Sequence, residues 1–224
     1  MEMKIMPALL DTDPEDMSAE LAKLTPYFKS FQIDVMDGIF VPDETVQLEE
    51  IKSVVEEYPD IIIDFHLMVE DWNHELDILE TFYNSNIRYV LIHAKTNPPA
   101  DVFIEQLSDH YRLGLVINPE EEIKTIVQEY DLSHIPAIQI MTVIPGKQGQ
   151  PFIEESLNKI EQLRHAGYKS DIIIDGAVNA KTLPVILGKK FVPDYAGAGS
   201  FLTRAKNLGE AISSLDTTAG VSRA

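Results

Sequence analysis

Eight strand-like segments alternate with eight helix-like segments along the 224 residues of the chain. This alternation predicts a parallel sheet whose strands are joined by helical crossovers. Eight such units in a chain of this length fit a closed (β/α)₈ barrel, the TIM barrel, better than an open doubly wound sheet. The predicted strands are residues 4–10, 31–36, 61–68, 87–93, 112–117, 137–143, 171–175 and 194–197. The predicted helices cover residues 14–24, 48–57, 72–84, 101–110, 121–130, 153–166, 180–187 and the residues from 207 onward.

The domain organisation follows from the even spacing of these units. No linker-like stretch separates one half of the chain from the other. Barrels of this type often form one domain of about 200–250 residues. We therefore expect a single barrel domain over residues 1–216 and a frayed tail over residues 217–224.

Composition and charge exclude several classes of function. The net charge of −19 argues against a nucleic-acid partner, whose phosphates the chain would repel. A small anionic substrate is compatible with this charge, because local backbone N–H groups can outweigh distant carboxylates. The chain has no cysteine, which excludes disulfides and thiolate chemistry. It has neither an apolar run of about 18 residues nor the pattern of a signal peptide. We therefore expect a cytoplasmic protein that does not enter a membrane.

The stretch from Phe31 to Pro42 is predicted to be a strand that ends in a polar site. Side chains two residues apart on a strand point to the same face, so Gln32, Asp34 and Met36 share one face. A carboxylate on the inward face of an apolar strand is costly unless a metal or hydrogen bonds hold it. Asp34 is therefore a candidate functional residue.

The third predicted strand places Asp64, His66 and Met68 on one face by the same rule. A lone histidine in a strand is more often a hydrogen-bonded core residue than a metal ligand. His66, however, lies at the C-terminal end of its strand, beside the strand of Asp34 and across the barrel from Asp175. One imidazole and two carboxylates suit a divalent cation such as zinc, iron, manganese or cobalt.

Glycine-containing segments follow the last three predicted strands. The segment Val143–Gln150 has glycines on both sides of Lys147 and Gln148, so it could close over a ligand, although an ordinary βα loop fits the pattern equally well. The small residues of Ile173–Val178 and Ala196–Ser200 are typical of the phosphate site of this fold, where backbone N–H groups face the anion. Tight turns that need glycine are the alternative for these two segments.

Taken together, these motifs resemble the ribulose-phosphate 3-epimerase family of sugar-phosphate epimerases. The resemblance extends from residue 4 to about residue 203, with the motifs in the family's order and spacing. It implies a barrel of the ribulose-phosphate-binding type. The motifs that carry it are Met6–Leu10, Ile33–Gly38, Phe40–Pro42, His66–Val69, His93–Ala94, Met141–Gly146, Gly149–Gln150, Asp175–Gly176 and Ala198–Ser200.

The resemblance implies one divalent metal ion (Zn, Fe, Mn or Co) held by two histidines and two aspartates. Asp34, His66 and Asp175 match three of these metal ligands, and Asp34 and Asp175 also match the acid–base pair. The residues that match the family's substrate site around the reacting carbons are Met36, Met68, Met141 and the position of Ala8. Those that match its phosphate-binding segments are Gly146, Gly149, Gly176, Ala177, Gly199 and Ser200.

Two positions depart from the family pattern: Gln32 stands where the family has a metal-binding histidine, and Ala8 where it has a serine. An amide oxygen is a neutral and harder ligand than imidazole. Gln32 could therefore coordinate the metal, hydrogen-bond to a water ligand, or leave a three-ligand site. Ala8 removes a hydroxyl whose hydrogen bond would be worth about 1 kcal/mol. Smaller departures are Ala177 for a glycine, Lys147–Gln148 in the loop after the sixth strand, and Lys95 where an acid is usual.

The favoured hypothesis is a 3-epimerase that acts on a ketose phosphate such as ribulose 5-phosphate. Its two aspartates would remove and return a proton, with an enediolate as the intermediate. The family resemblance also implies a homo-oligomer. The alternative is a non-catalytic or diverged sugar-phosphate-binding barrel that has lost full metal coordination, which Gln32 and Ala8 motivate. A decarboxylase or aldolase of phosphorylated sugars is disfavoured, because no lysine stands at an inward strand end.

Overall fold

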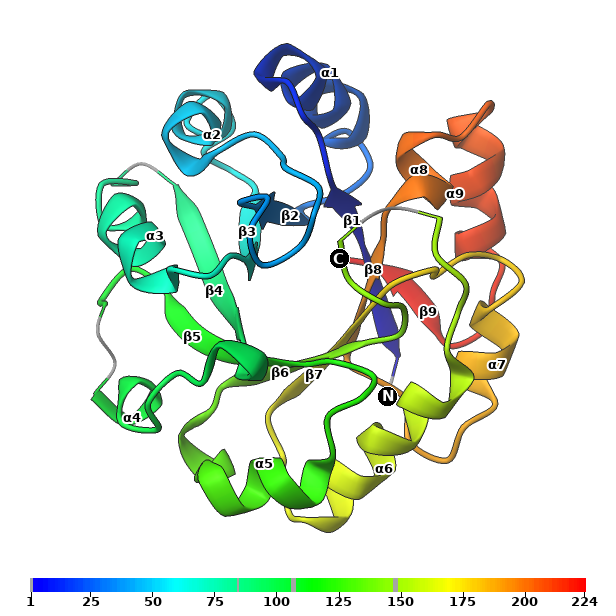
Figure 1. The fold of residues 1–224 in the computed structure, drawn as a ribbon. Helices are drawn as coiled ribbons and strands as arrows, with labels where there is room; N and C mark the ends of the chain where they lie inside the picture. Colours follow the sequence, from blue (N-terminus) through cyan, green and yellow to red (C-terminus); the bar gives the residue numbers. More distant parts are fainter. Residues whose placement is uncertain (1, 84, 106–107, 147–148) are drawn as a thin grey trace.

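The computed structural model describes residues 2–83, 85–105, 108–146 and 149–224 and shows a closed barrel of parallel strands surrounded by helices (Figure 1). Strands β1 to β8 follow one another around the barrel in chain order, and β1 pairs with both β8 and β2 to close it. This confirms the predicted (β/α)₈ architecture. Within the described residues, no helix is long and apolar enough to cross a membrane.

The elements have the following bounds. The strands are β1 (Met3–Leu9), β2 (Ser30–Met36), β3 (Ile62–Met68), β4 (Asn86–His93), β5 (Arg112–Ile117), β6 (Ala137–Met141), β7 (Asp171–Asp175), β8 (Tyr195–Ala198) and β9 (Val221–Arg223). The helices are α1 (Pro14–Leu24), α2 (Leu48–Val55), α3 (Trp72–Leu79), α4 (Val102–Glu105), α5 (Ile123–Glu129), α6 (Asn158–His165), α7 (Leu183–Leu187), α8 (Ser200–Thr203) and α9 (Leu208–Asp216). Short 3₁₀ turns are η1 (Ala94–Thr96), η2 (Leu132–His134) and η3 (Glu154–Leu157).

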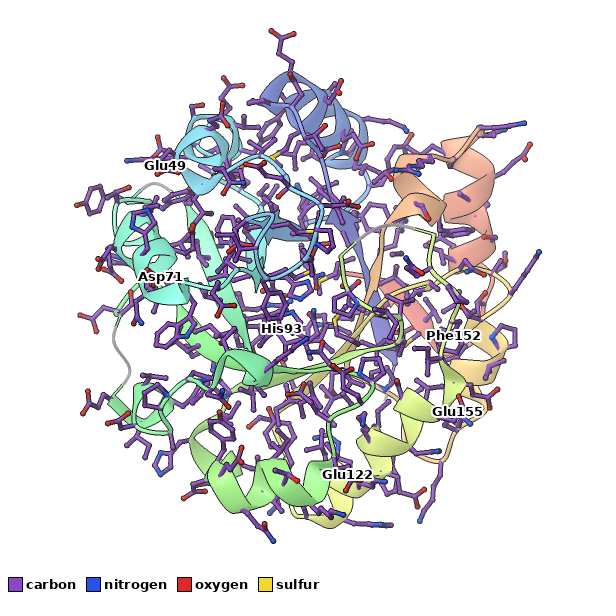
Figure 2. All side chains as sticks on the ribbon, viewed as in Figure 1. Glu49, Asp71, His93, Glu122, Phe152 and Glu155 are labelled. Atoms are coloured by element: carbon purple, nitrogen blue, oxygen red, sulfur yellow. The ribbon has the colours of Figure 1, made fainter. Side chains whose placement is uncertain are left out.

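The strands are apolar because both of their faces are covered. All seven residues of β2 are buried, since one face points into the barrel and the other packs under the helices. The helices show the complementary pattern, and α1 buries only one stripe through Met17, Leu21 and Leu24. Figure 2 shows the result from above: Glu49 and Glu122 lie on the outer ring, whereas His93 lies near the centre.

Several helix boundaries differ from the sequence prediction. The helix predicted from residue 180 begins at Leu183, because Pro184 fits only in the first turn of a helix. The helix predicted from residue 153 opens as the 3₁₀ turn η3 before α6. The short helix α8 begins at Ser200, and Gly199 separates it from β8. The predicted helices 72–84 and 101–110 end at Leu79 and Glu105 as described elements; residues 84, 106 and 107 lie outside the described residues.

The predicted frayed tail is wrong for its last residues. Val221 and Arg223 in β9 pair in parallel with β1, and Val221 is buried. The backbone of Ala224 continues this contact, because its N–H donates to Ile5 (2.8 Å) and its C=O accepts from Lys29 (2.8 Å). Strand β1 pairs with β2 only further along, at Ala8–Leu9. The C-terminal residues therefore bridge β1 and the start of β2 at the N-terminal end of the barrel.

A buried ion pair fills the lower barrel. Arg88 donates two hydrogen bonds to the carboxylate of Asp64 (2.9 and 2.6 Å), and its guanidinium lies 4.0 Å from the ring centroid of Tyr195. Asp64 shares a strand face with His66, as expected, but its carboxylate is fully used by Arg88. Asp64 is thus part of the scaffold below the candidate site.

Removal of residues 221–224 should lower the free energy of unfolding by about 2–4 kcal/mol, because buried Val221 and several backbone hydrogen bonds are lost. Urea unfolding followed by circular dichroism measures the change. The matched control is Ser222→Ala, which keeps the β9 backbone and should stay within about 0.5 kcal/mol of the unmodified chain. Equal stability of the truncated and full chains would show that β9 contributes nothing.

Candidate functional site

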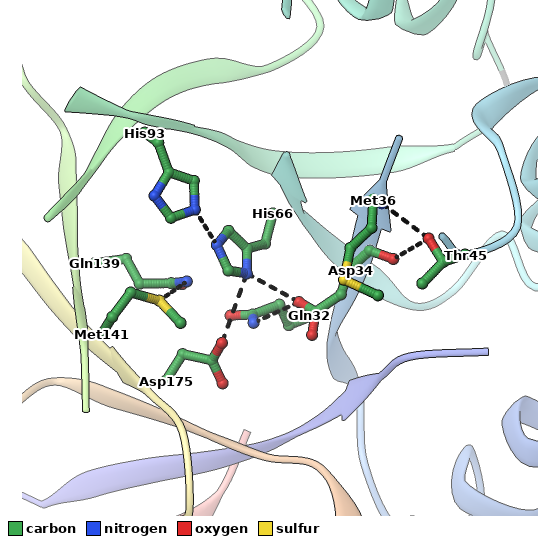
Figure 3. Close-up of polar contacts among 9 residues, drawn as sticks. All are labelled: Gln32, Asp34, Met36, Thr45, His66, His93, Gln139, Met141 and Asp175. Atoms are coloured by element: carbon green, nitrogen blue, oxygen red, sulfur yellow. Dashed lines mark hydrogen bonds and ion pairs between the residues drawn. The ribbon is translucent and has the colours of Figure 1, made fainter. Parts of the chain in front are cut away.

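Three strands bring Asp34, His66 and Asp175 together at the C-terminal mouth of the barrel (Figure 3). Asp34 on β2 and His66 on β3 are register partners, whereas Asp175 ends β7 on the other side. His66 Nδ1 lies 3.0 Å from Asp34 Oδ1 and 3.5 Å from Asp175 Oδ2. All three residues are buried, and one ligand atom from each lies within 4.8 Å of the others. The barrel thus joins residues that are far apart in sequence around one imidazole nitrogen.

Gln32 belongs to the same cluster. Its Nε2 donates to Asp34 Oδ1 (2.9 Å), and its amide also faces Asp175, where it stabilises the charged carboxylate. Its Oε1 is buried and has no hydrogen-bond partner among the described residues. Ala8 is the register partner of Gln32 on β1, so the two positions that depart from the family pattern are neighbours. Gly197 on β8 completes this wall, since a Cβ there would lie 3.0 Å from Asp175 Oδ1 and 3.6 Å from Gln32 Oε1.

Burial and neighbouring charges shift the pKa values of Asp175 and His66. Burial, followed by the charge of Asp34, raises the pKa of Asp175 from its ordinary value of 3.8 to about 7. Burial alone would lower the pKa of His66, but its hydrogen bond to Asp34 and the charges of both carboxylates outweigh this and raise it. Asp175 can therefore carry a proton near neutral pH.

His93 at the end of β4 also contacts the site, although the sequence analysis did not include it among the site residues. Its Nε2 lies 2.9 Å from Nε2 of His66, and the two rings stack with centroids 5.0 Å apart. Burial, followed by the charge of His66, holds the pKa of His93 well below its usual range. Neutral His93 thus occupies the far nitrogen of His66 and leaves Nδ1 facing the carboxylates. Its position at the C-terminal end of a strand was the signal available in the sequence.

Two of the three methionines predicted at the substrate site line a cavity at the barrel mouth. Met68 and Met141 line a cavity of about 300 Å³ that opens beside Asp34 and Asp175. Met36 is not among the lining residues and packs in a small cluster with Val41 and Met68. The place of Met36 at the substrate stays a prediction.

The segments after β6, β7 and β8 form the other wall of this cavity. All the residues named above as phosphate-site candidates line it: Gly146, Gly149, Gly176, Ala177, Gly199 and Ser200. Gly176 cannot carry a side chain, since a Cβ there would lie 2.5 Å from Val143. Ala177 has a φ of +55°, the left-handed region that favours glycine. Lys147 and Gln148 lie outside the described residues.

The cavity has further lining residues that were not among the predicted site residues. Leu10 and Phe201 add apolar surface, while Gln150 and Asn179 add amide groups. Ala8 also lines it, as expected. Leu10 lies in the motif Met6–Leu10 and Gln150 in the motif Gly149–Gln150. No motif singled out Asn179 or Phe201, because their place depends on how the loops fold over the mouth.

The donor set at the barrel mouth fits a divalent cation. Two carboxylate oxygens and one imidazole nitrogen converge there, and the unpartnered Oε1 of Gln32 offers a fourth donor in the same wall. Buried polar atoms normally have a partner, so an orphaned oxygen beside two carboxylates is an independent sign of a ligand site. The residues that could hold the ion are Asp34, His66, Asp175 and Gln32.

Comparison with known proteins agrees with this geometry. The family model described as "Ribulose-phosphate 3 epimerase family" matches residues 4–193. The chain belongs to this family. The ribulose-phosphate 3-epimerase of Bacillus subtilis (strain 168) is 29% identical over 193 residues, which cover 80% of this chain and 86% of the relative. That of Encephalitozoon cuniculi (strain GB-M1) is 30% identical over 194 residues, which cover 86% and 84%.

Solved structures of other barrels resemble this family member in fold. KGPDC from Streptococcus mutans superimposes with a TM-score of 0.69 at 14% identity, over 96% of this chain and 95% of that chain. The 3-hexulose-6-phosphate synthase from Salmonella typhimurium gives a TM-score of 0.68 at 14% identity, over 95% and 96%. At such low identity these likenesses show the shared barrel alone.

Asp175 should make the stability of the metal-free protein depend on pH. Because the folded chain holds this proton up to about pH 7 and the unfolded chain releases it near pH 3.8, stability conferred by the group falls as pH rises between these values. We expect the Asp175→Asn variant to lack this fall. Urea unfolding of both proteins in a chelator at several pH values between 4 and about 8 measures the difference, in which titrating groups outside the Asp34–His66–Asp175 cluster cancel. A difference that stays constant with pH would contradict the raised pKa of Asp175.

Ala177→Gly should raise the free energy of unfolding by about 0.5–1 kcal/mol, because it relieves the left-handed backbone strain of an alanine. The matched control is Ala180→Gly, three residues along the same loop and outside the left-handed region, which should lower stability instead. Urea unfolding measures both variants. A loss of stability in both would mean that the φ of Ala177 carries no strain.

Proposed function

We propose that this family member is a metal-dependent 3-epimerase of a ketose phosphate, such as ribulose 5-phosphate, which it converts to xylulose 5-phosphate. The observation that carries the proposal is the convergence of Asp34 and Asp175 from β2 and β7 on one cavity. Carboxylates on two sides of a cavity suit a reaction that removes a proton from one face of a carbon and returns one to the other.

The two aspartates have distinct tasks in this reaction. One carboxylate accepts the proton from the carbon next to the ketone, and the protonated partner donates to the opposite face. Without a bound cation, burial and the charge of Asp34 raise the pKa of Asp175 to about 7, so the two carboxyl groups can hold one proton between them at neutral pH. General acid–base catalysis of this kind contributes about 10²–10⁴-fold to the rate.

The surrounding residues hold the substrate for this proton transfer. A divalent cation bound by Asp34, His66 and Asp175 would supply positive charge beside the oxygens on which negative charge develops. Met68 and Met141 give the sugar chain an apolar wall that excludes water from the reacting carbon. The loops after β6, β7 and β8 line the end of the cavity where backbone N–H groups can bind the phosphate.

A second candidate function is a sugar-phosphate-binding barrel without turnover. Gln32 and Ala8 motivate it, because both stand where the family pattern has groups that contact metal or substrate. The phosphate loops and the cavity would serve this role equally well. Assembly of several copies stays a prediction from the family resemblance, and the molar mass of the protein in solution tests it.

Asp34→Asn and Asp175→Asn should each lower epimerisation of ribulose 5-phosphate by at least about 10²-fold, because each removes one partner of the proton transfer. Turnover is assayed with added Mn²⁺, Zn²⁺, Fe²⁺ or Co²⁺, and binding of the sugar phosphate is measured alongside. Asp60→Asn on the exposed surface is the matched control and should keep full activity.

Two outcomes would decide against the epimerase. Binding of ribulose 5-phosphate without turnover under every metal would favour the binding barrel. Turnover that survives in either aspartate variant would show that the proton moves through other groups.

A further inference from the structure

The metal centre that this chain can build is rich in oxygen. The ligand atoms that converge are one oxygen from each of Asp34 and Asp175 and one nitrogen from His66. The fourth group within the same wall is the amide of Gln32, whose Oε1 has no partner among the described residues. We propose that Gln32 Oε1 is the fourth ligand and that it shifts the preference of this centre from Zn²⁺ toward Mn²⁺. The proposal uses the site of the proposed epimerase, but metal binding is measured without turnover.

The position of Gln32 is fixed by the strand and by its neighbours. It lies two residues before Asp34 on β2, so both side chains enter the barrel on the same face. It is fully buried, beside Ala8 on β1 and Gly197 on β8. Neither neighbour has a side-chain group that could hydrogen-bond with Oε1. The small residues on both sides thus leave the amide oxygen free for a ligand.

The amide can face the carboxylates with either end. In the structure its Nε2 donates to Asp34 Oδ1 at 2.9 Å, as expected for an amide beside two anions. A half-turn about the last side-chain torsion exchanges nitrogen and oxygen, and this torsion is broad and roughly two-fold. A cation between the carboxylates reverses the electrostatic preference, because it attracts the carbonyl dipole and repels the N–H groups. The same side chain therefore suits both the metal-free and the metal-bound state.

No second imidazole can take the fourth place. His93 is the nearest candidate, but its Nε2 contacts Nε2 of His66, the nitrogen that faces away from the carboxylates. It therefore supports His66 from behind, as the partners of metal-binding histidines commonly do. The remaining histidines are exposed on the outside of the barrel: His74, His110, His134 and His165. The chain has no cysteine to supply a softer donor.

This donor set determines the expected selectivity. Carboxylate and carbonyl oxygens suit Mn²⁺ and other hard cations, whereas imidazole favours Zn²⁺. Zn²⁺ binds more tightly than Mn²⁺ to most protein sites, so the measurable quantity is the ratio of the two affinities. Partners beyond the direct ligands already change metal affinity by about 10–100-fold. Exchange of a direct ligand should therefore change the Zn²⁺/Mn²⁺ affinity ratio by at least about tenfold.

The test compares metal affinities of the full chain and of Gln32 variants after removal of metal with a chelator. Titration calorimetry gives the Zn²⁺ affinity, and electron paramagnetic resonance of free Mn²⁺ gives the Mn²⁺ affinity. Gln32→His should raise the Zn²⁺/Mn²⁺ affinity ratio by about tenfold or more. Gln128→His on the exposed face of α5 is the matched control for an added imidazole and should leave the ratio unchanged.

Two further variants separate ligation by Oε1 from positioning of Asp34 by Nε2. Gln32→Met has similar volume without an oxygen and should lose at least about tenfold in Mn²⁺ affinity. Gln32→Glu keeps an oxygen at the same reach but loses the N–H donor, so its Mn²⁺ affinity should equal or exceed that of the unmodified chain. Three results would overturn the proposal. They are a Gln32→Met variant that binds Mn²⁺ as tightly as the unmodified chain, a Gln32→Glu variant that loses as much Mn²⁺ affinity as Gln32→Met, and a Gln32→His variant with an unchanged Zn²⁺/Mn²⁺ affinity ratio. Circular dichroism verifies that each variant is folded.

Discussion

The repulsion between two buried carboxylates is the constraint around which the barrel mouth is built. Asp34 and Asp175 share one imidazole nitrogen at 3.0 and 3.5 Å, and like charges this close disfavour ionisation of both. The protein offsets the repulsion in three ways: a raised pKa on Asp175, the N–H groups of His66 and Gln32, and a donor set suited to a cation. In the proposed epimerisation, the raised pKa of Asp175 would let one carboxyl donate a proton while the other accepts one.

Contacts elsewhere in the barrel support the positions of Asp34 and Asp175. The Arg88–Asp64 ion pair fills the barrel directly below, and β9 joins β1 to the start of β2 at the opposite end from the site. His93 holds the back of His66. A site assembled from strand ends inherits its precision from these contacts, since small displacements of a catalytic group are costly to the rate.

The sequence predicted the barrel and the Asp34–His66–Asp175 cluster because both depend on local periodicity and on the rule that active sites lie at strand ends. It failed where long-range packing decides. The tail looked frayed because β9 is short and its partner β1 lies more than 200 residues away in sequence. His93 had no recognisable role until its ring was placed behind His66.

The two departures from the family pattern are register partners, and this favours one local change over a general loss of the site. Gln32 and Ala8 meet on adjacent strands, and both lie in the wall that carries Asp175 and Gly197. Asp34, Asp175 and the six candidate phosphate residues line the cavity beside these two positions, and His66 contacts both carboxylates. A barrel that had lost its chemistry would have no physical reason to keep two mutually repelling aspartates buried, because replacement of either would relieve their strain. The presence of both carboxyl groups therefore favours the proposed epimerisation, with Gln32 and Ala8 as a local change beside them.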